Sequence, residues 1–453
     1  MIKSMTLSAL NSVLKGRLSG PDASFLRVST DTRTLCAGDL YVALVGESFD
    51  GNEFIAQAFA KGACGAVVNE LIAGDWPQLS VADTTVALGE IARCNRLESQ
   101  AQVIAVTGSQ GKTTVKEMIG CILGVNHPVL VTKANFNNHV GVPLTLLELN
   151  STHQRAVIEL GASGPGEIAY TVEMVMPHVA VLTNAAATHI EGFGDLQGVV
   201  RTKGEIIDGL PAAGIAVLNA DDANIQSWID RAARRRVYTF GMNSATADYF
   251  ATQIRGGGGT GSIFTLNTPA GSISISLALL GLHNVVNAVA AAAACTAVGC
   301  TLEEIKTGLE RIKSIPGRMQ MLTGVRGAVL IDDSYNASPS SFHAAIDALA
   351  AHIGHRILVV GDMAELGSQC ESAHAEVGRY ARTHGIDTLW SVGQFSALAS
   401  AAFGSNGRHF DNQRALIEQA RTVFGPGVIA LVKGSRSAEM DKVVEQLKSG
   451  EPS

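Results

Sequence analysis

The sequence predicts an α/β protein built from more than one domain. Its 453 residues are about three times the length of a typical ~150-residue domain, so two or three domains with sizeable cores are expected. From about residue 101 onward, short runs of Val, Ile, Leu and Ala alternate with longer helical patterns. This alternation predicts parallel sheets that are covered by helices.

Two blocks of predicted strands can be separated after residue 101. The first has strands near residues 103–106, 156–159, 179–183 and 216–219, each ending in a polar or glycine-containing loop, where such sheets bind ligands. The second begins after Pro316 and Gly317, with strands near residues 328–332, 357–360, 388–392 and 429–432. It predicts a smaller, separate sheet of the nucleotide-binding type.

The other segments are less regular. Residues 1 to about 100 predict helices near 7–14 and 54–61 and a strand near 40–44. Between 245 and 275, four consecutive glycines at 256–259 interrupt β-type residues, which predicts a hairpin with a flexible turn. No Lys-Ser or Lys-Thr follows these glycines, so we expect no phosphate site there.

Composition excludes several classes of protein. The 34 basic against 41 acidic residues provide no basic field, so nucleic acid is a poor candidate partner. Seven cysteines without a Cys-x-x-Cys pair predict reduced, buried thiols in a cytoplasmic protein rather than disulfides or a zinc site. The N-terminus lacks an export signal, and the longest apolar run, 288–298, is roughly half of the ~20 residues of a membrane span. We expect a soluble protein in which this run forms a buried helix.

A phosphate-binding loop is the clearest motif. An apolar strand at 103–106 leads into Gly108-Ser109-Gln110-Gly111-Lys112-Thr113-Thr114, and an amphipathic helix follows at 115–123. In this context glycines let the backbone wrap around phosphate, Lys112 reaches the outer phosphates, and the Thr113 hydroxyl can ligate magnesium. The strict Walker spacing requires glycine where this chain has Val106. A short glycine turn is common by chance, but the strand–loop–helix context favours the phosphate loop.

A carboxylate at the end of a neighbouring strand is expected to hold the metal ion or its water. Glu159 ends the apolar run 156–158 and is well placed for this role. The alternative is an ordinary acidic residue at a strand end.

Further motifs carry a resemblance to a known family. They lie at residues 107–117, 135–143 (Asn-Phe-Asn-Asn-His-Val-Gly-Val-Pro), 159–161, 188–193, 203–206, 283–287, 316–318, 332–337, 361–367 and 432–437. Together these motifs closely resemble those of the Mur ligases, in order and over nearly the whole chain. The resemblance implies three domains: a smaller N-terminal α/β domain for the UDP end of the substrate (1–100), a central P-loop-type parallel-sheet ATPase domain (101–315) and a C-terminal Rossmann-like domain (316–453).

The resemblance also implies the reaction. In this family ATP phosphorylates a carboxylate of a nucleotide-linked peptide, and an amine attacks the acyl phosphate to form an amide, with release of phosphate and ADP. The motifs are most similar to those of members that join D-alanyl-D-alanine to UDP-N-acetylmuramoyl-tripeptide in peptidoglycan precursor synthesis. One alternative is the member that adds the third stem-peptide residue, but its Asp-Asn-Pro-Arg signature is absent. Another is a non-catalytic, ATP-gated binding protein. We expect a monomer, and the third residue of the tripeptide is left open.

Roles for individual residues follow from the same resemblance. The catalytic set is Lys112, His189, Lys203 and Arg318. Two magnesium ions are expected, held by Thr113 and Glu159 and by His189 and Lys203, with Lys203 carbamylated by carbon dioxide. The simpler alternatives for His189 and Lys203 are a polar loop histidine and a helix-surface lysine. ATP is expected to contact residues 108–114, Asn284 and Asn287 at adenine, Arg318 at the phosphates and Asp333 at ribose. Asn284 and Asn287 could also cap the alanine-rich helix that follows.

The nucleotide-linked substrate is expected at a separate set of residues. Motifs at 29–33 and 44–51 resemble the uridine-diphosphate region, and the expected substrate contacts are Ser29, Thr32, Arg33, Gly46, Asp50 and Asn138. Two positions depart from the family pattern. Asn52 replaces the usual histidine and Ser338 replaces the usual asparagine, which leaves their contacts open.

Overall fold

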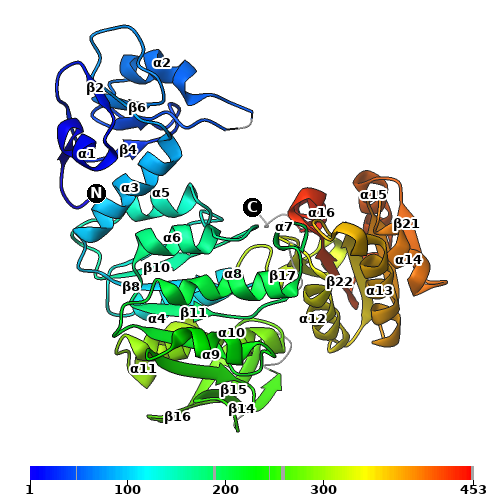
Figure 1. Ribbon diagram of the computed structural model, residues 1–453. Coiled ribbons are helices and arrows are strands. Elements are labelled where there is room, and N and C mark those ends of the chain that lie inside the picture. The colour runs from blue at the N-terminus through cyan, green and yellow to red at the C-terminus, as the bar shows by residue number, and fades with distance from the viewer. Residues whose placement is uncertain (47, 187–189, 244, 257–260, 450–453) are drawn as a thin grey trace.

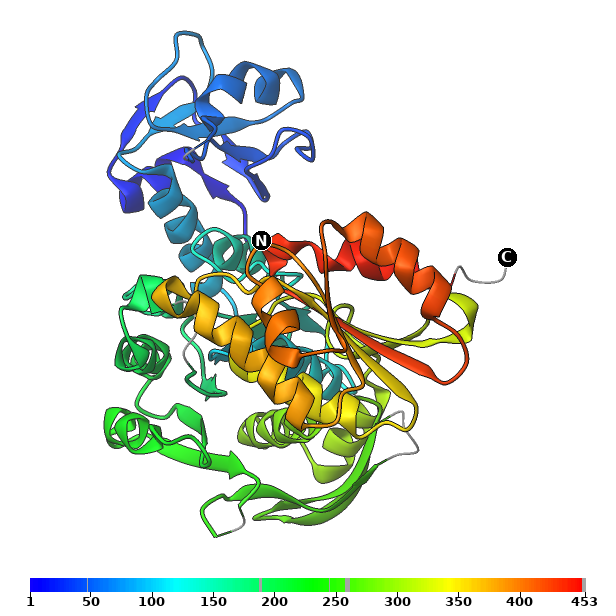
Figure 2. The same cartoon turned by 90° about the vertical axis from the view of Figure 1, so that its right-hand side faces the viewer.

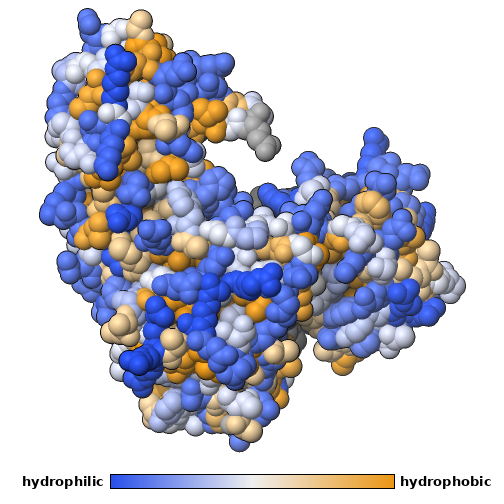
Figure 3. Space-filling model, in the orientation of Figure 1, coloured by the Kyte–Doolittle hydropathy of each residue, from blue (hydrophilic) through white to orange (hydrophobic). Residues whose placement is uncertain are grey.

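The computed structural model describes residues 1–46, 48–186, 190–243, 245–256 and 261–449. Three sheets organise the chain into an N-terminal, a middle and a C-terminal unit (Figure 1). Figure 2 shows the C-terminal unit in front of the middle unit, with the N-terminal unit above them. In the space-filling view an open concavity separates the N-terminal and C-terminal units (Figure 3).

The N-terminal unit contains a five-stranded sheet in the order β2-β7-β6-β5-β4. Its neighbours are parallel except for β2 and β7. The strands are β2 (Arg17–Ser19), β4 (Val28–Ser29), β5 (Leu40–Val42), β6 (Gly65–Val68) and β7 (Gln78–Ser80), with a separate ladder of β1 (Met5–Thr6) and β3 (Ser24–Phe25). The helices are α1 (Leu7–Leu14), η1 (Gly51–Phe54), α2 (Ile55–Ala60) and α3 (Thr84–Leu97). The predicted helices near 7–14 and 54–61 and the strand near 40–44 are confirmed.

Helix α3 joins the N-terminal unit to the middle unit. The Asn95 amide donates to the carbonyls of Leu146 and Leu149, and the Arg96 guanidinium donates to those of Val175 and Met176. These buried bonds satisfy carbonyls near the C-terminal ends of two middle-unit helices. One hydrophobic core therefore runs from the N-terminal unit into the middle unit.

The middle unit is a nine-stranded sheet in the order β16-β15-β14-β13-β12-β11-β8-β10-β9. Its strands are β8 (Gln102–Thr107), β9 (Val129–Val131), β10 (Arg155–Glu159), β11 (Val179–Leu182), β12 (Ile215–Asn219), β13 (Arg236–Gly241), β14 (Tyr249–Gly256), β15 (Ser262–Thr268) and β16 (Gly271–Leu277). Its helices are α4 (Lys112–Leu123), α5 (Gly141–Leu147), α6 (Glu167–Val175), α7 (Ile190–Phe193), α8 (Leu196–Asp208), α9 (Ile225–Ala232), α10 (Leu282–Ala297) and α11 (Leu302–Arg311). Alternate residues of β8 pack into two different cores, which shows that helices cover both faces.

The prediction of parallel strands is confirmed for β8 to β13, and the region 245–275, for which a hairpin was predicted, forms the antiparallel edge of this sheet. Strands β14, β15 and β16 pair antiparallel, because the connection from Thr268 to Gly271 is far too short for a parallel crossover. The predicted hairpin is confirmed, with residues 257–260 of its turn outside the described residues. The predicted buried helix at 288–298 is the second half of α10, in which Ala288 to Cys295 are fully buried.

The C-terminal unit is a smaller six-stranded sheet in the order β17-β18-β22-β19-β20-β21. Its strands are β17 (Gln320–Thr323), β18 (Val329–Asp333), β19 (His355–Gly361), β20 (Thr388–Val392), β21 (Gly407–Phe410) and β22 (Val428–Lys433), and only β17 is antiparallel to its neighbour. Its helices are η2 (Val325–Gly327), α12 (Pro339–Ala350), η3 (Gly367–Gln369), α13 (Cys370–Thr383), α14 (Ala397–Phe403), α15 (Gln413–Val423), η4 (Arg436–Ala438) and α16 (Met440–Leu447). The separate second sheet is therefore confirmed.

Two absences bear on the expectations from composition. None of the seven cysteines is paired, but Cys295 alone among them is buried, so the prediction of buried thiols is wrong for the other six. Among the helices of the described residues, none combines the length and the apolar character needed to cross a membrane.

Candidate active site

The main cavity lies between the middle and C-terminal units and has a volume of about 940 Å³. The middle unit contributes the phosphate loop, Glu159 and the first turns of α10. The C-terminal unit contributes the loops after β18 and β22. The carboxyl ends of the parallel strands β8, β10, β18 and β22 thus face one space, which is where α/β sheets bind ligands.

The phosphate loop owes its shape to two glycines. Gly108 has φ +145° and Gly111 has φ +79°. A Cβ atom on Gly108 would lie 2.0 Å from Thr183 Oγ1, and one on Gly111 would lie 2.5 Å from Asn287 Oδ1. Helix α4 begins directly after Gly111, which provides no side-chain cap. The first N–H groups of α4 therefore point toward the cavity without a side-chain acceptor, as an anion site requires.

Lys112 is the first residue of α4 and lies over the loop. Its Nζ donates to the carbonyls of Gly108 at 2.7 Å and Ser109 at 3.3 Å. Burial lowers the pKa of Lys112, the Glu159 carboxylate opposes this shift, and the nearby Arg318 cation adds to it. At the phosphate loop the Lys112 cation thus has the Arg318 cation and the Glu159 carboxylate as charged neighbours, an arrangement suited to a polyphosphate with a metal ion.

Glu159 ends β10 with one carboxylate oxygen fixed and the other open. The residue is buried, Oε1 accepts from Asn137 Nδ2 at 2.8 Å, and Oε2 has no hydrogen-bond partner among the described residues. An unpaired, buried carboxylate oxygen is costly unless a cation or donor completes it. The structure thus makes Glu159 a fit metal ligand. Asn137 belongs to one of the quoted motifs, but no role was predicted for it.

The protein alone does not build a closed metal cage at this site. Within the part of the chain that the structure describes, no group of three or more His, Cys, Asp and Glu side chains could hold a metal ion. Thr113 lines the same cavity as Glu159 and offers a hydroxyl there. This sparse set suits magnesium, which binds through one or two protein oxygens, water and substrate phosphates.

Lys203 is buried in α8, so the alternative of a helix-surface lysine is wrong. Its Nζ donates to Ala162 O at 3.2 Å and lies 5.2 Å from the centre of the Phe193 ring. Burial, with a smaller contribution from the Lys112 cation, lowers the pKa of Lys203 from 10.5 to about 7, against the opposing effect of Glu167 and Glu205. A large neutral fraction is therefore present near neutral pH. His189, the other predicted ligand of the second metal ion, lies outside the described residues.

Asn284 and Asn287 lie inside the first turns of α10, so the alternative that they cap this helix is wrong. The N-cap position belongs to Gly281. Asn284 Nδ2 donates to Leu280 O at 2.7 Å, and Asn287 Nδ2 donates to Asn284 Oδ1 at 3.2 Å. Both asparagines line the cavity next to the phosphate loop.

Arg318 enters the cavity from the segment that links the middle and C-terminal units. Its guanidinium lies 4.1 Å from the centre of the Tyr335 ring, which orients it by a cation–π contact. Its Nε atom is buried and has no partner among the described residues. Arg318 therefore keeps a donor available for a ligand.

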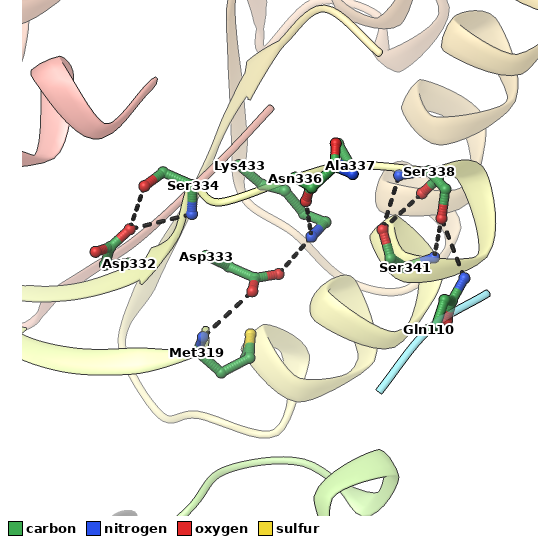
Figure 4. A network of polar contacts seen from close by, with 10 residues as sticks. All are labelled: Gln110, Met319, Asp332, Asp333, Ser334, Asn336, Ala337, Ser338, Ser341 and Lys433. Atoms are coloured by element: carbon green, nitrogen blue, oxygen red, sulfur yellow. Dashed lines mark hydrogen bonds and ion pairs between the residues drawn. The ribbon is translucent and has the colours of Figure 1, made fainter. Parts of the chain in front are cut away.

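Asp333 is held by a residue for which the sequence predicted no role. Asp333 Oδ2 accepts from Lys433 Nζ at 2.6 Å and Oδ1 accepts from Met319 N at 3.2 Å (Figure 4). Lys433 Nζ also donates to Asn336 O at 3.0 Å. Burial lowers the pKa of Lys433, and the Asp333 carboxylate opposes that shift. The ion pair fixes the loop that follows β18 at the cavity wall.

The predicted substrate residues do not form one group. Asn138 lines the cavity, whereas the other five belong to the N-terminal unit: Ser29, Thr32, Arg33, Gly46 and Asp50. Thr32 Oγ1 donates to Gln57 Oε1 at 2.8 Å, and Arg33 is exposed and paired with Asp31 at 2.7 Å. These five residues thus belong to the unit that Figure 3 shows across a concavity from the C-terminal unit.

The two departures from the family pattern have local partners. Asp50 Oδ1 accepts from the backbone N and the side-chain amide of Asn52 at 2.8 and 2.7 Å. Ser338 is the N-cap of α12, in a reciprocal capping box with Ser341. Serine is thus compatible with the start of this helix.

Comparison with known proteins identifies the family. Residues 106–295 match the model of the Mur ligase middle domain, and residues 317–436 match that of the Mur ligase glutamate ligase domain. The chain belongs to the Mur ligase family. It is 46% identical to the UDP-N-acetylmuramoyl-tripeptide–D-alanyl-D-alanine ligase of Escherichia coli, over 98% of both chains.

Solved structures of the same type share the whole fold. A crystal structure of MurF from Acinetobacter baumannii matches with a TM-score of 0.91 and 37% identity, over 98% of both chains. MurF from Thermotoga maritima in complex with ADP matches with a TM-score of 0.83 and 27% identity, over 93% of this chain and 96% of that one. The expected three-part α/β architecture is confirmed.

Proposed function

We propose that this Mur ligase joins D-alanyl-D-alanine to the tripeptide carboxylate of UDP-N-acetylmuramoyl-tripeptide, with conversion of ATP to ADP and phosphate. The observation that carries the proposal is the shared cavity, in which the phosphate loop and the open oxygen of Glu159 face the loops of the C-terminal unit. The 46% identity to the Escherichia coli ligase of that name, over nearly the full length, supports the choice of substrates.

The phosphate loop would bind the ATP phosphates through residues 108–114. Lys112 already donates two hydrogen bonds to loop carbonyls and would transfer them to phosphate oxygens. Thr113 and Glu159 would hold one magnesium ion, since a hydroxyl and an open carboxylate oxygen are the hard ligands that this ion prefers. Bound magnesium would neutralise phosphate charge and so reduce the repulsion between ATP and the substrate carboxylate.

We propose that carbamylated Lys203 and His189 serve a second ion. The neutral Lys203 amine would attack the carbon of carbon dioxide, forming an N–C bond and losing one proton, which leaves an anionic carbamate in place of a cation. Burial supports this reaction because it lowers the pKa of Lys203 to about 7. The carbamate would face the Lys112 cation, whose field disfavours the ammonium form of Lys203.

The nucleoside would lie across the seam between the two units. Asn284 and Asn287 are placed for adenine, Arg318 for the phosphates and Asp333 for ribose, as the resemblance implies. The free donor of Arg318 supports a phosphate contact. Asp333 would contact ribose while it remains paired with Lys433.

The nucleotide-linked peptide would span the concavity between the units. Ser29, Thr32, Arg33, Gly46 and Asp50 would bind its uridine-diphosphate end, and Asn138 would contact it at the cavity. The tripeptide carboxylate would then meet the terminal phosphate at Lys112. Attack of its oxygen would give an acyl phosphate and ADP, and the D-alanyl-D-alanine amine would displace phosphate to form the amide. Closing the cavity over these reactants keeps water away from the acyl phosphate.

A substrate panel tests the proposal. ADP release should require both UDP-N-acetylmuramoyl-tripeptide and D-alanyl-D-alanine, and Lys112→Met should abolish it. Equal ADP release with the dipeptide nucleotide and diaminopimelate would instead identify the ligase that adds the third stem-peptide residue. ADP release without either substrate would favour an ATP-gated binding protein.

The unpaired cysteines support a cytoplasmic location, and a monomer is expected in solution.

A further inference from the structure

One side chain of the phosphate loop leaves the loop and reaches the C-terminal unit. Gln110 Nε2 donates to Ser338 Oγ at 3.1 Å and to Ser340 Oγ at 2.5 Å (Figure 4 draws the first of these bonds). The bonded residues are 228 and 230 positions apart in the chain. They join a loop of the middle unit to the start of α12.

The backbone of Gln110 is fixed to the middle unit. Its N–H donates to Asn184 Oδ1 at 3.0 Å, and its carbonyl accepts from Thr183 Oγ1 at 2.5 Å. Because the main chain is held on both sides, no further backbone entropy is lost when the side chain bonds to the other unit, and the remaining entropic cost is that of the side-chain rotamers.

The two acceptors are fixed just as firmly to the C-terminal unit. Ser338 caps α12, its backbone N–H donates to Ser341 Oγ at 2.9 Å, and Ser341 Oγ donates back to Ser338 O at 2.9 Å. The loop before Ser338 is anchored by the bond from Lys433 to Asn336 O and by the Asp333–Lys433 ion pair. Both halves of the contact are therefore preorganised.

We infer that the Gln110 side chain is a latch that holds the C-terminal unit closed over the phosphate loop. A carboxamide has two N–H hydrogens, and Gln110 gives one to each serine, so its side chain bonds to the other unit instead of making the phosphate contact expected for residues 108–114. Gln110 is thus a positioning residue: the latch keeps Arg318, Asp333 and Lys433 opposite Lys112. The inference deepens the proposed function and rests on it for its kinetic consequences.

The latch also explains why serine is suited to position 338. Serine caps α12 and still accepts a bond from Gln110. Asparagine, the usual residue of the family pattern, also caps helices and accepts hydrogen bonds. Ser338→Asn should therefore keep the latch, whereas alanine at 338 and 340 removes both acceptors.

A mutant cycle tests the latch through coupling. The variants are Gln110→Ala, the pair Ser338→Ala with Ser340→Ala, and the triple variant. Gln110→Ala should raise the KM for ATP about tenfold with a smaller change in kcat, because the closed arrangement becomes less populated. The serine pair should give a similar loss, and the triple variant should lose no more than either parent. Losses that multiply in the triple variant would overturn the latch, since they would mean that Gln110 and the serines act separately.

A control and a second measurement separate the latch from helix capping and from ligase activity. Ser341→Ala removes the hydroxyl side of the capping box but leaves the Ser341 N–H bond to Ser338 Oγ and both bonds of Gln110, so it should lower the melting temperature and raise the KM for ATP much less than Gln110→Ala. Small-angle X-ray scattering of the ligand-free protein should give a larger radius of gyration for Gln110→Ala than for wild type and Ser341→Ala. Equal radii would overturn the latch even if the wild type is an active ligase. Wild-type inactivity with a larger radius for Gln110→Ala would instead refute the proposed function alone.

Discussion

Replacement of Lys203 by methionine should stabilise the metal-free protein and abolish its ligase activity. The two side chains have similar length, so methionine can fill the buried space in α8, where Lys203 makes one hydrogen bond, to Ala162 O. The fall of the Lys203 pKa from 10.5 to about 7 corresponds to roughly 5 kcal/mol of strain on the protonated form, at 1.36 kcal/mol per pKa unit. Loss of the Ala162 bond and imperfect packing should reduce the net gain to about 2–4 kcal/mol.

The stability that Lys203→Met gains over the wild type should depend on pH in a defined direction. Because the pKa of Lys203 is lowered on folding, the folded state binds fewer protons than the unfolded state between about pH 7 and 10.5. The wild-type penalty is thus complete below pH 7 and is relieved as pH rises toward 10.5. The advantage of Lys203→Met should be largest near pH 6.5 and clearly smaller near pH 9.5.

Calorimetry of the metal-free protein in carbon dioxide-free buffer measures this difference. About 2–4 °C per kcal/mol is expected for a unit of this size, so a gain of about 2–4 kcal/mol should raise the melting temperature by roughly 4–16 °C at the lower pH. A melting temperature that falls at the lower pH, or an equal change at both pH values, would refute the buried neutral amine. Either result would also remove the physical reason for expecting a carbamate on Lys203.

Other predictions address the phosphate loop, the metal ligand and the buried ion pair. Glu159→Gln should fold normally but lose roughly 100-fold or more of its activity and its manganese binding, followed by electron paramagnetic resonance; normal manganese affinity would contradict the ligand role. Gly108→Ala should destabilise the protein by about 2–5 kcal/mol and weaken ADP binding in calorimetric titration, because its Cβ would lie 2.0 Å from Thr183 Oγ1. Lys433→Met should cost about 3–5 kcal/mol by leaving the Asp333 carboxylate buried, and adding Asp333→Asn should recover most of it in thermal unfolding. No recovery would mean that Lys433 acts by packing alone.

Local chain physics made much of the fold predictable. The strands at 103–106 and 156–159 are apolar runs that end in loops, and both are interior strands of the nine-stranded sheet, β8 and β10. The place of the hairpin strands in the sheet was harder to predict, because it depends on which other strand has a free edge for pairing. Strand β14 adds to the edge formed by β13, a contact that the residues of β14 do not encode locally.

The residues of the candidate site also fall into two groups, those with a local sequence signal and those that only the fold brings together. Lys112 and Glu159 were predictable because each has a local signal, a phosphate loop or a strand end. The pairing of Lys433 with Asp333 joins residues that are 100 positions apart, and only the fold brings them together. Lys203 had an unused signal: it lies at helical spacing from the buried Val199, Val200, Ile206 and Ile207, which indicates the buried face of α8.

The most direct test of the account is the fate of the oxygen atoms of the tripeptide carboxylate. UDP-N-acetylmuramoyl-tripeptide labelled with ¹⁸O in that carboxylate is incubated with ATP, magnesium and D-alanyl-D-alanine, and the released phosphate is examined by mass spectrometry. Activation on the phosphate loop predicts one ¹⁸O atom in each phosphate released, because the oxygen that attacks phosphorus leaves with it. Amide formation with unlabelled phosphate, or with the label in AMP, would contradict phosphoryl transfer to the carboxylate.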